Sequence, residues 1–418
     1  MHSPESARRN AMVQQILDDY SYEGALLSAP VEQALRRVPR ELFLTGLDLA
    51  DVYNAHKAVV TKRDEDKGVA LSSVSAPSII ATMLDRADLQ PGMRVLEIGS
   101  GGYNAALIAE LVGSEGEVTT IDIDSDVIDR ARRCLDTAGY PQVRTAVADG
   151  EYGFADRAPY DRVLVTAGAW DIPPAWTEQL ASGGRMVVPM RVRGLTRCLT
   201  LDADEDGVLH SKHVDMCGFV RMQGAGEHWE PMPYLNDTPG QQIGLRLEDG
   251  PEVDAEALRK AMAETGTPVW SGVMVGVEED ASDQDLWVAS VADRWALLTA
   301  DQGAVDTGLV TPTWILGTPA LVSPAGDSFA YRTLRQSPNE NELWEFGAIG
   351  HGPTGTEMAE QLTDHIRSWD RQHRSGSGPE AVCYPRSTPA DRLPAGRVVD
   401  KAHTRMVITW PSPTPEGD

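Results

Sequence analysis

A short glycine-rich loop follows an apolar segment in the N-terminal half of the chain. Residues 94–98 (Arg-Val-Leu-Glu-Ile) are typical of a buried strand, Gly99-Ser100-Gly101-Gly102 follow it, and residues 103–112 are typical of a helix. Glycines let the backbone turn sharply and approach a ligand closely, and the free N–H groups at a helix N-terminus bind a carboxylate or a phosphate. The loop alone also fits a purely structural turn, and it lacks the G-x-G-x-x-G spacing of a dinucleotide site.

Two acidic side chains follow the next two predicted strands. Asp122 ends the strand predicted at 117–121, where a carboxylate can accept hydrogen bonds from ribose hydroxyls, and Asp124 is a nearby alternative that lies further from the strand end. The Asp149-Gly150 pair follows the third strand, where a carboxylate can accept a hydrogen bond from the amino group of adenine. The pair also fits a simple turn. A nicotinamide cofactor needs only the loop and the first acid, so the three features together favour S-adenosylmethionine.

The elements that position these residues alternate regularly. Strands alternating with helices of 10–13 residues predict βαβ units and a parallel sheet. Right-handed crossovers then place the loops after the strands along one edge, where ligands bind. The fold class is therefore α/β and Rossmann-like, preceded by helices within residues 1–90. The predicted strands are 94–98, 117–121, 143–147, 161–166 and 185–190, and the predicted helices between them are 103–112, 126–138 and 172–180.

The regular alternation stops after about residue 226. Residues 230–233 (Glu-Pro-Met-Pro) are typical of a connector, and we expect a methyl-donor-binding domain at 1–229, a separate α+β domain at 234–410 and a disordered tail at 411–418. The additional domain is a candidate for recognition of a peptide. Its predicted helices are 254–264 and 356–371, and its predicted strands are 269–277, 286–292 and 295–298.

The composition narrows the possible partners and the compartment. The 418 residues carry a formal net charge of −26, which disfavours nucleic acid because phosphates are bound mainly by Lys and Arg. No run of 18 apolar residues occurs, so we expect no membrane span, and the N-terminus leads into an amphipathic helix rather than an apolar signal. The four cysteines lack CxxC spacing, which predicts neither a metal site nor a disulfide framework and indicates the reducing cytoplasm. The oligomeric state stays open.

Several segments, taken together and in order, resemble the protein-L-isoaspartate O-methyltransferase family. The most selective pair is Val-Pro-Arg-Glu-Leu-Phe at 38–43 and Ser75-Ala76-Pro77. The resemblance extends over about residues 30–200 and implies S-adenosylmethionine as the cofactor and a peptide or protein carboxylate as the methyl acceptor. The matching segments are 38–43, 74–77, 91–101, 149–150, 158–167 and 183–189.

The resemblance also implies roles for individual residues. It places the family's active-site Ser or Thr at Ser75, whose hydroxyl can hold a carboxylate oxygen in line, and the alternative is that Ser75 only caps the helix that begins after Pro77. We expect substrate contacts from Ser75, Ala76 and Ala167. The expected cofactor contacts are Glu97, Gly99, Ser100, Gly101, Asp122, Ile123, Asp149, Gly150 and Thr166.

Three features depart from the family pattern. The loop is one residue shorter than the family's Gly-x-Gly-Ser-Gly-Tyr, the segment at 63–68 is more charged, and a whole domain follows residue 230. This combination resembles the divergent branch associated with the biosynthesis of lanthipeptides and other modified ribosomal peptides. The branch implies methylation of an aspartate in a cyclised precursor peptide, and collapse of the ester to a succinimide (aspartimide) that can open to isoaspartate.

The reaction that these residues suggest needs no general base. A peptide carboxylate with an ordinary pKa near ~3.9 is ionised at neutral pH and can attack a sulfonium methyl group directly. Alignment of the two reactants is then the enzyme's main contribution. Three alternatives stay open: housekeeping repair of isoaspartyl residues, which the additional domain disfavours; methylation of a small molecule, which the Ser75 segment disfavours; and a non-catalytic binding module, which the intact Asp122 and Asp149 disfavour.

Overall fold

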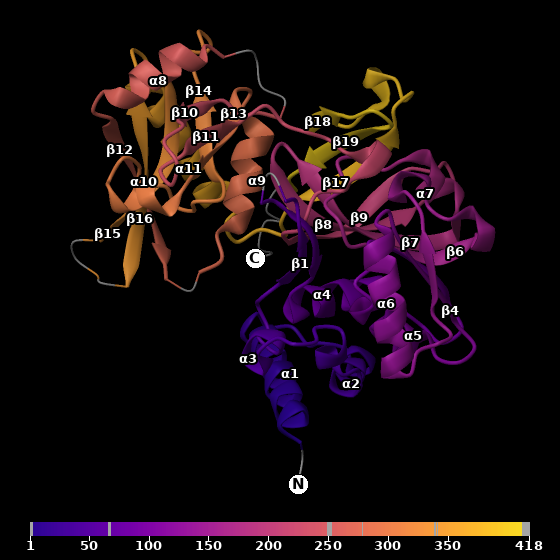
Figure 1. Ribbon diagram of the computed structural model, residues 1–418. Coiled ribbons are helices and arrows are strands. Elements are labelled where there is room, and N and C mark those ends of the chain that lie inside the picture. The colour runs from indigo at the N-terminus through magenta and orange to yellow at the C-terminus, as the bar shows by residue number, and fades with distance from the viewer. Residues whose placement is uncertain are drawn as a thin grey trace, which may run out of the picture.

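The computed structural model describes residues 3–65, 68–248, 253–277, 279–337, 340 and 342–411. The protein has two lobes, each built around its own β-sheet (Figure 1). Over the described residues, the larger lobe holds a ten-stranded sheet and the N-terminal helices, and the smaller lobe holds a seven-stranded sheet. No helix among these residues is long and apolar enough to cross a membrane.

The part of the large sheet that carries the glycine loop is parallel. Its strands lie in the order β5-β4-β3-β6-β7, and each neighbouring pair is parallel. Strand β3 is buried at all but its first residue, as expected of a strand covered on both faces. The Rossmann-like α/β prediction is confirmed. The elements are β3 (Arg94–Ile98), α5 (Tyr103–Val112), β4 (Glu117–Asp122), α6 (Ser125–Ala138), β5 (Arg144–Val147), β6 (Tyr160–Val165), α7 (Pro174–Glu178) and β7 (Leu180–Val192).

The large sheet is completed by residues from near the C-terminus. Antiparallel strands extend it beyond β7 in the order β8-β9-β17-β19-β18, and Figure 1 shows the yellow C-terminal strands beside the magenta ones. The range 234–410, expected as one domain, therefore contributes to both sheets. Of the expected tail, residues 412–418 lie outside the described part. These strands are β8 (Leu195–Ala203), β9 (Leu209–Met216), β17 (Glu380–Pro385), β18 (Arg397–Asp400) and β19 (Thr404–Thr409).

The N-terminal residues form helices and one hairpin. The segment at 55–75, which shows no clear pattern in the sequence, contains the antiparallel strands β1 and β2. Lys62 on β1 forms ion pairs with Asp124 and Asp126, which joins the hairpin to the start of α6. The hairpin is thereby held beside the glycine-loop edge of the large sheet. The elements are α1 (Pro4–Tyr22), α2 (Ala29–Arg37), α3 (Leu49–Val52), β1 (Val59–Arg63), β2 (Ala70–Val74) and α4 (Pro77–Ala87).

The smaller lobe is an antiparallel sheet packed with helices. Its strand order is β10-β11-β13-β14-β15-β16-β12. The prediction of a strand at 286–292 is wrong: residues 286–291 belong to helix α9 and residue 292 follows its end. The apolar residues fit either period because the run is short. The elements are β10 (Tyr234–Asn236), β11 (Ile243–Arg246), α8 (Ala255–Ala263), β12 (Thr267–Gly276), α9 (Ser282–Val291), β13 (Trp295–Ala300), α10 (Gln302–Asp306), β14 (Thr318–Val322), β15 (Phe329–Gln336), β16 (Leu343–His351) and α11 (Gly355–Gln372).

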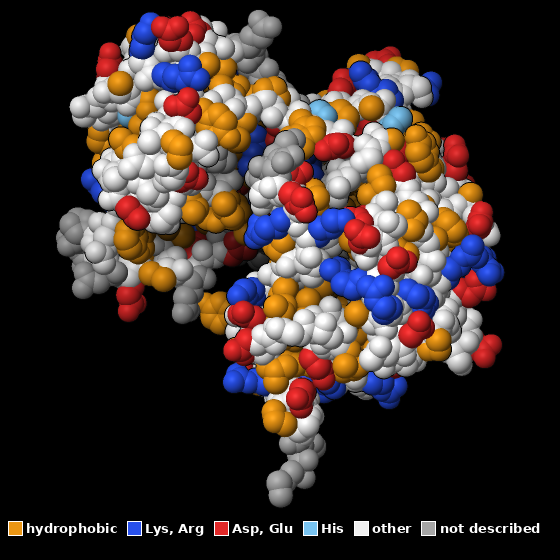
Figure 2. All heavy atoms as spheres, in the orientation of Figure 1, with side chains coloured by type: hydrophobic (Ala, Val, Ile, Leu, Met, Phe, Trp, Pro, Cys, Tyr) orange, Lys and Arg blue, Asp and Glu red, His pale blue; other side chains and the backbone are white. Residues whose placement is uncertain are grey.

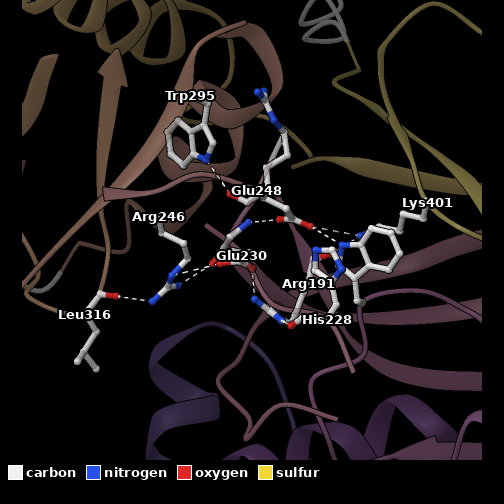
Figure 3. A network of polar contacts seen from close by, with 11 residues as sticks. Arg191, His228, Glu230, Arg246, Glu248, Trp295, Leu316 and Lys401 are labelled. Carbon is white, nitrogen blue, oxygen red and sulfur yellow. Dashed lines mark hydrogen bonds and ion pairs between the residues drawn. The ribbon is translucent and has the colours of Figure 1, made fainter. Parts of the chain in front are cut away.

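A buried network of charged side chains joins the two lobes (Figure 3). Glu230 of the connector forms ion pairs with Arg191 of β7 and Arg246 of β11, and its side chain is 0% exposed. Glu248 accepts a hydrogen bond from the Trp170 indole at 2.9 Å, and the Lys401 ammonium lies 3.6 Å from the same oxygen. These contacts link the connector, the first sheet and the returning C-terminal strands.

A groove separates the smaller lobe from the N-terminal helices. It encloses about 1720 Å³ of space, part of it open to solvent, and is lined by α1, α4, the end of β9 and residues of the smaller lobe that include Asp283 and Trp369. Figure 2 shows a hollow between the two lobes on one face, with acidic and basic side chains interspersed around it. The groove is large enough to accommodate an extended peptide segment.

Candidate active site

A cavity lies at the edge of the large sheet where the parallel strands end. It holds about 580 Å³ of space, part of it open to solvent. The structure places eight of the predicted residues on its wall and adds two segments that the sequence did not reveal. The predicted residues on the wall are Gly99, Ser100, Gly101, Asp122, Ile123, Gly150, Thr166 and Ala167.

The glycine loop is pressed against the end of β6. Gly99 has a φ of +96°, and a Cβ atom there would lie 2.7 Å from the Thr166 hydroxyl oxygen. That hydroxyl donates to the Gly99 carbonyl at 2.6 Å, so the loop and the strand end are held together. A Cβ on Gly101 would lie 3.3 Å from Val74 of the hairpin. The glycines are therefore needed for the close approach of three chain segments around the cavity.

Asp122 faces the cavity from the end of β4, and its carboxylate is fixed by backbone groups. The N–H of Ser100 donates to one oxygen at 3.0 Å, and the N–H of Asp124 donates to the other at 2.9 Å. Burial raises the pKa of Asp122 above its ordinary value, although these two N–H groups act against the rise. Asp124, the alternative acid, caps α6 and does not border this cavity. The geometry therefore favours Asp122 for the ribose hydroxyls.

A second, smaller cavity of about 360 Å³ adjoins the first and shares Gly101 and Thr166 with it. Ser75 lies on its wall, and its hydroxyl has no hydrogen-bond partner among the described residues. Helix α4 begins at Pro77 with Ala76 as its N-cap, and no side chain caps it by a hydrogen bond. The structure therefore does not show the capping role that was the alternative for Ser75.

Glu97 lines this second cavity rather than the first. Its carboxylate accepts hydrogen bonds from Asn104 at 2.8 Å and Thr120 at 2.5 Å. Burial raises the pKa of Glu97 to about 7, and the nearby charge of Asp122 adds to the rise. Glu97 thus lies behind the glycine loop, so its predicted cofactor contact stays a prediction.

Asp149 borders neither cavity. Its carboxylate accepts hydrogen bonds from the N–H groups of Glu151 at 3.0 Å and Ala225 at 2.8 Å. The second of these bonds holds the turn at 224–226 against the strand end. Gly150 does line the first cavity, and Trp176 donates to its carbonyl at 2.7 Å. The adenine contact predicted for Asp149 stays a prediction, and so does the substrate contact of Ala76.

Two segments that sequence reasoning missed close the first cavity. Residues 71–73 of the hairpin and residues 220–223 after β9 both line it. The Gln223 amide donates to the Leu71 carbonyl at 3.1 Å, so the two segments meet over the cavity. Residues 220–222 are held to β6 by hydrogen bonds with Gly168. No local signal marks them, because their role depends on contacts with distant parts of the chain.

The cavity walls fit S-adenosylmethionine. The Ser100 hydroxyl and the Asn104 amide oxygen are buried without a hydrogen-bond partner within the described residues, and they border the first and second cavities respectively. Buried polar atoms of this kind are normally satisfied, so they indicate a polar ligand. Asp122 supplies fixed acceptors for hydroxyls, and Gly99 and Gly101 let the backbone approach. Among the described residues, no cluster of His, Cys, Asp and Glu is suited to hold a metal ion.

Known proteins with similar sequences cover about half of the chain. The family model of "Protein-L-isoaspartate(D-aspartate) O-methyltransferase (PCMT)" matches residues 10–227. A protein-L-isoaspartate O-methyltransferase of Hyperthermus butylicus is 40% identical over 48% of this chain and 84% of the relative. Those of Methanopyrus kandleri and Pyrococcus horikoshii are 37% and 39% identical over 50% and 49% of this chain, and each match covers 89% of the relative.

Solved structures of similar proteins include a protein-L-isoaspartate O-methyltransferase with a TM-score of 0.46 at 21% identity, covering 86% of this chain and 92% of that chain. Another, from Plasmodium falciparum and in complex with S-adenosyl-L-homocysteine, has a TM-score of 0.42 at 17% identity, covering 50% and 97%. The fold, the cavity and the sequence relatives define an S-adenosylmethionine-dependent O-methyltransferase. The chain belongs to the protein-L-isoaspartate O-methyltransferase family.

Proposed function

We propose that this enzyme methylates the carboxylate of an aspartyl or isoaspartyl residue in a peptide. The observation that carries the proposal is the pair of adjoining cavities, one that fits the methyl donor and one that contains the free hydroxyl of Ser75. The names of the sequence relatives support the same substrate class. The cofactor supplies a methyl group bound to a positively charged sulfur, which a carboxylate oxygen can attack without prior deprotonation.

The residues of the chain then have positioning roles. Asp122 accepts hydrogen bonds from the donor's ribose, and Gly99 and Gly101 allow the backbone to approach it. Ser75 donates a hydrogen bond to one oxygen of the acceptor carboxylate and leaves the other oxygen free to react. Residues 71–73 and 220–223 cover the cavity and exclude water. Such alignment contributes up to roughly 7–11 kcal/mol in favourable intramolecular models.

The more specific proposal concerns the substrate. We infer that the acceptor is an aspartate in a cyclised ribosomal peptide, with the methyl ester collapsing to a succinimide as the following backbone nitrogen attacks and methanol leaves. Two features support it: the smaller lobe lies outside the part of the chain matched by the sequence relatives, and a large groove separates that lobe from the N-terminal helices.

Housekeeping repair of isoaspartyl residues in damaged proteins is the second candidate. The specific observation in its favour is the identity of 37–40% with relatives that carry the isoaspartate name, over at least 84% of their length. The residues around the first cavity fit either acceptor, because the methyl donor is the same in both reactions. The substrate therefore has to be distinguished by turnover.

The test is a panel of three peptides incubated with the enzyme and S-adenosylmethionine: a linear isoaspartyl peptide, its aspartyl isomer and the aspartyl sequence closed into a ring. We expect a gain of one methyl group, followed by net loss of water, on the cyclic aspartyl peptide. Equal or better turnover of the isoaspartyl peptide would contradict the cyclic-substrate proposal. No methylation of any of the three would contradict the wider proposal.

The variant Ser75→Ala tests the arrangement of the second cavity. We expect kcat/KM for the peptide to fall at least about tenfold, because loss of one hydrogen bond to a charged group costs about 1.5–3 kcal/mol. Binding of S-adenosylhomocysteine, measured by calorimetry, should not change. Thr137→Ala on helix α6 is the control, because Thr137 is exposed and borders neither the two cavities nor the groove.

A further inference from the structure

Arg221 is a charged side chain on the wall of the first cavity, and the described residues offer its guanidinium no hydrogen bond or ion pair. It lies between Val220 and Met222, which line the same cavity. The side chain is half-buried, and its guanidinium carbon lies 4.6 Å from the centre of the Trp229 ring.

Two neighbouring arginines are satisfied in a different way. Arg191 and Arg246 form ion pairs with the same buried carboxylate, Glu230 (Figure 3). Arg221 forms no such ion pair within the residues that the structure describes. Burial together with the charge of Arg246 lowers its pKa from the ordinary value, with Glu227 acting in the opposite direction. The guanidinium of Arg221 therefore forms no ion pair within the described part of the chain, beside a cavity whose wall also carries the Asp122 carboxylate.

The backbone around Arg221 is fixed rather than free. The N–H of Gly168 donates to the Val220 carbonyl at 2.7 Å, and the N–H of Met222 donates to the Gly168 carbonyl at 3.1 Å. Arg221 therefore lies across from Gly168, the residue after Ala167 at the end of β6. Ala167, one of the predicted substrate contacts, lines the same cavity as Arg221.

We propose that Arg221 is a carboxylate-binding residue of this active site, held by its contact with Trp229 and directed at an anion in or beside the first cavity. The planar guanidinium presents paired N–H donors that match a carboxylate, and contact of its face with an aromatic ring leaves the donors at its edge available. The proposal rests on the proposed function, in which two groups carry a carboxylate: the amino-acid part of the cofactor and the peptide acceptor.

The first experiment tests the cofactor's carboxylate. Calorimetry compares wild type and Arg221→Gln for two ligands: S-adenosylhomocysteine, and 5′-methylthioadenosine, which lacks the amino-acid group. If Arg221 binds the cofactor, the variant loses about ten- to a hundredfold affinity for the first ligand and none for the second. That range corresponds to the loss of a charge-assisted hydrogen bond.

The second experiment tests the acceptor's carboxylate by binding rather than turnover. With S-adenosylhomocysteine present, fluorescence anisotropy measures the affinity of each peptide of the panel and of its counterpart in which Asn replaces the acidic residue. If Arg221 binds the acceptor, wild type prefers the carboxylate over the amide at least about tenfold, and Arg221→Gln loses that preference. Arg221→Lys keeps the charge without the paired donors, so its preference for the carboxylate peptide should lie between those of wild type and Arg221→Gln.

Arg144→Gln is the matched control, since Arg144 also lies over an aromatic ring, Phe154 at 5.1 Å, and borders neither cavity. The assignment of Arg221 is overturned if Arg221→Gln binds S-adenosylhomocysteine as tightly as wild type and also prefers the carboxylate peptide as strongly as wild type does. A wild type that shows no preference for the carboxylate peptide counts as an unchanged preference. A wild type that binds these ligands as expected but methylates no peptide contradicts the proposed function alone.

Discussion

The cofactor cavity contains a half-buried carboxylate and the junction between the two lobes contains fully buried ones, and the partners of these carboxylates differ. At the junction, Glu230 is shared by two guanidinium groups and Glu248 by an indole and an ammonium. In the cavity wall, Asp122 accepts hydrogen bonds from two backbone N–H groups and from no other group of the described residues. A carboxylate can accept about four hydrogen bonds, so Asp122 retains capacity for a ligand.

This difference separates residues that stabilise the structure from residues that bind. A buried charge with a full set of partners contributes little when a ligand arrives, but removal of one partner leaves another charge buried and unpaired. A buried polar group with unused capacity is costly to the folded protein and becomes satisfied by a ligand. We therefore expect substitutions at the junction to affect unfolding, and substitutions around the cavity to affect S-adenosylhomocysteine binding.

The largest effect is expected from Glu230→Ala. Loss of this carboxylate leaves Arg191 and Arg246 buried without their counterion, which should lower the free energy of unfolding by about 3–5 kcal/mol. Urea unfolding followed by tryptophan fluorescence measures the change. The exposed Glu115→Ala is the control and should stay within about 0.5 kcal/mol. A similar, small effect of both variants would show that the junction does not depend on this charge.

Asp122→Ala tests the expectation that substitutions around the cofactor cavity affect ligand binding. We expect affinity for S-adenosylhomocysteine to fall about a hundredfold, because hydrogen bonds between a carboxylate and the ribose hydroxyls are lost. Calorimetry measures the affinity directly. Asp129→Ala removes an exposed acid of helix α6 that borders neither cavity, and it should leave the affinity nearly unchanged. Retained binding in the Asp122 variant would refute its ribose role.

Glu97→Gln addresses the pH dependence of stability. Burial raises the pKa of Glu97 to about 7, so the folded state favours the protonated acid. Its contribution is fully present below the ordinary pKa of ~4.5 and is lost as the pH rises through about 7. The variant cannot ionise, so the decline in unfolding free energy between pH 4.5 and 8 should become smaller by about 3 kcal/mol. An unchanged pH profile would contradict this assignment.

Gly99→Ala should give the smallest effect. The new Cβ would lie 2.7 Å from the Thr166 hydroxyl and the φ of +96° would be strained, so we expect about tenfold weaker binding of S-adenosylhomocysteine and a stability loss of roughly 1–2 kcal/mol. Gly113→Ala has a φ of +67° but no atom within 4 Å of the new Cβ. It should lose stability alone, which separates backbone strain from displacement of the loop. Equal binding losses would contradict this interpretation.

Much of the large sheet was predictable because its signals are local. The run at 94–98 is apolar, glycines follow it, and Asp122 ends the next strand, so each feature is contained in a few consecutive residues. The short run at 286–292 shows the limit of such signals. Its apolar residues fit a strand or a helix equally well, and the packed structure selects helix α9.

The sequence predicted the residues of the candidate site that follow the parallel strands, but not the segments that cover the cavity. Gly99, Asp122 and Thr166 follow strands of a parallel sheet, and the topology rule brings such residues to one edge. The residues that cover the cavity, 71–73 and 220–223, come from a hairpin and from an irregular segment. Nothing in their own sequence distinguishes them from ordinary connections, so only their contacts across the fold reveal this role.

The sequence by itself determined the parallel α/β core, the glycine loop and the positions of its acids, because hydrophobic period and turn chemistry act between neighbours in the chain. The tertiary structure decided which charges are paired, how the cavity is covered and where the C-terminal strands lie. Strand β17 pairs Val382 with His210, and Glu230 joins Arg191 to Arg246. Contacts of this kind depend on the complete packing of the chain, and patterns in a few consecutive residues do not predict them.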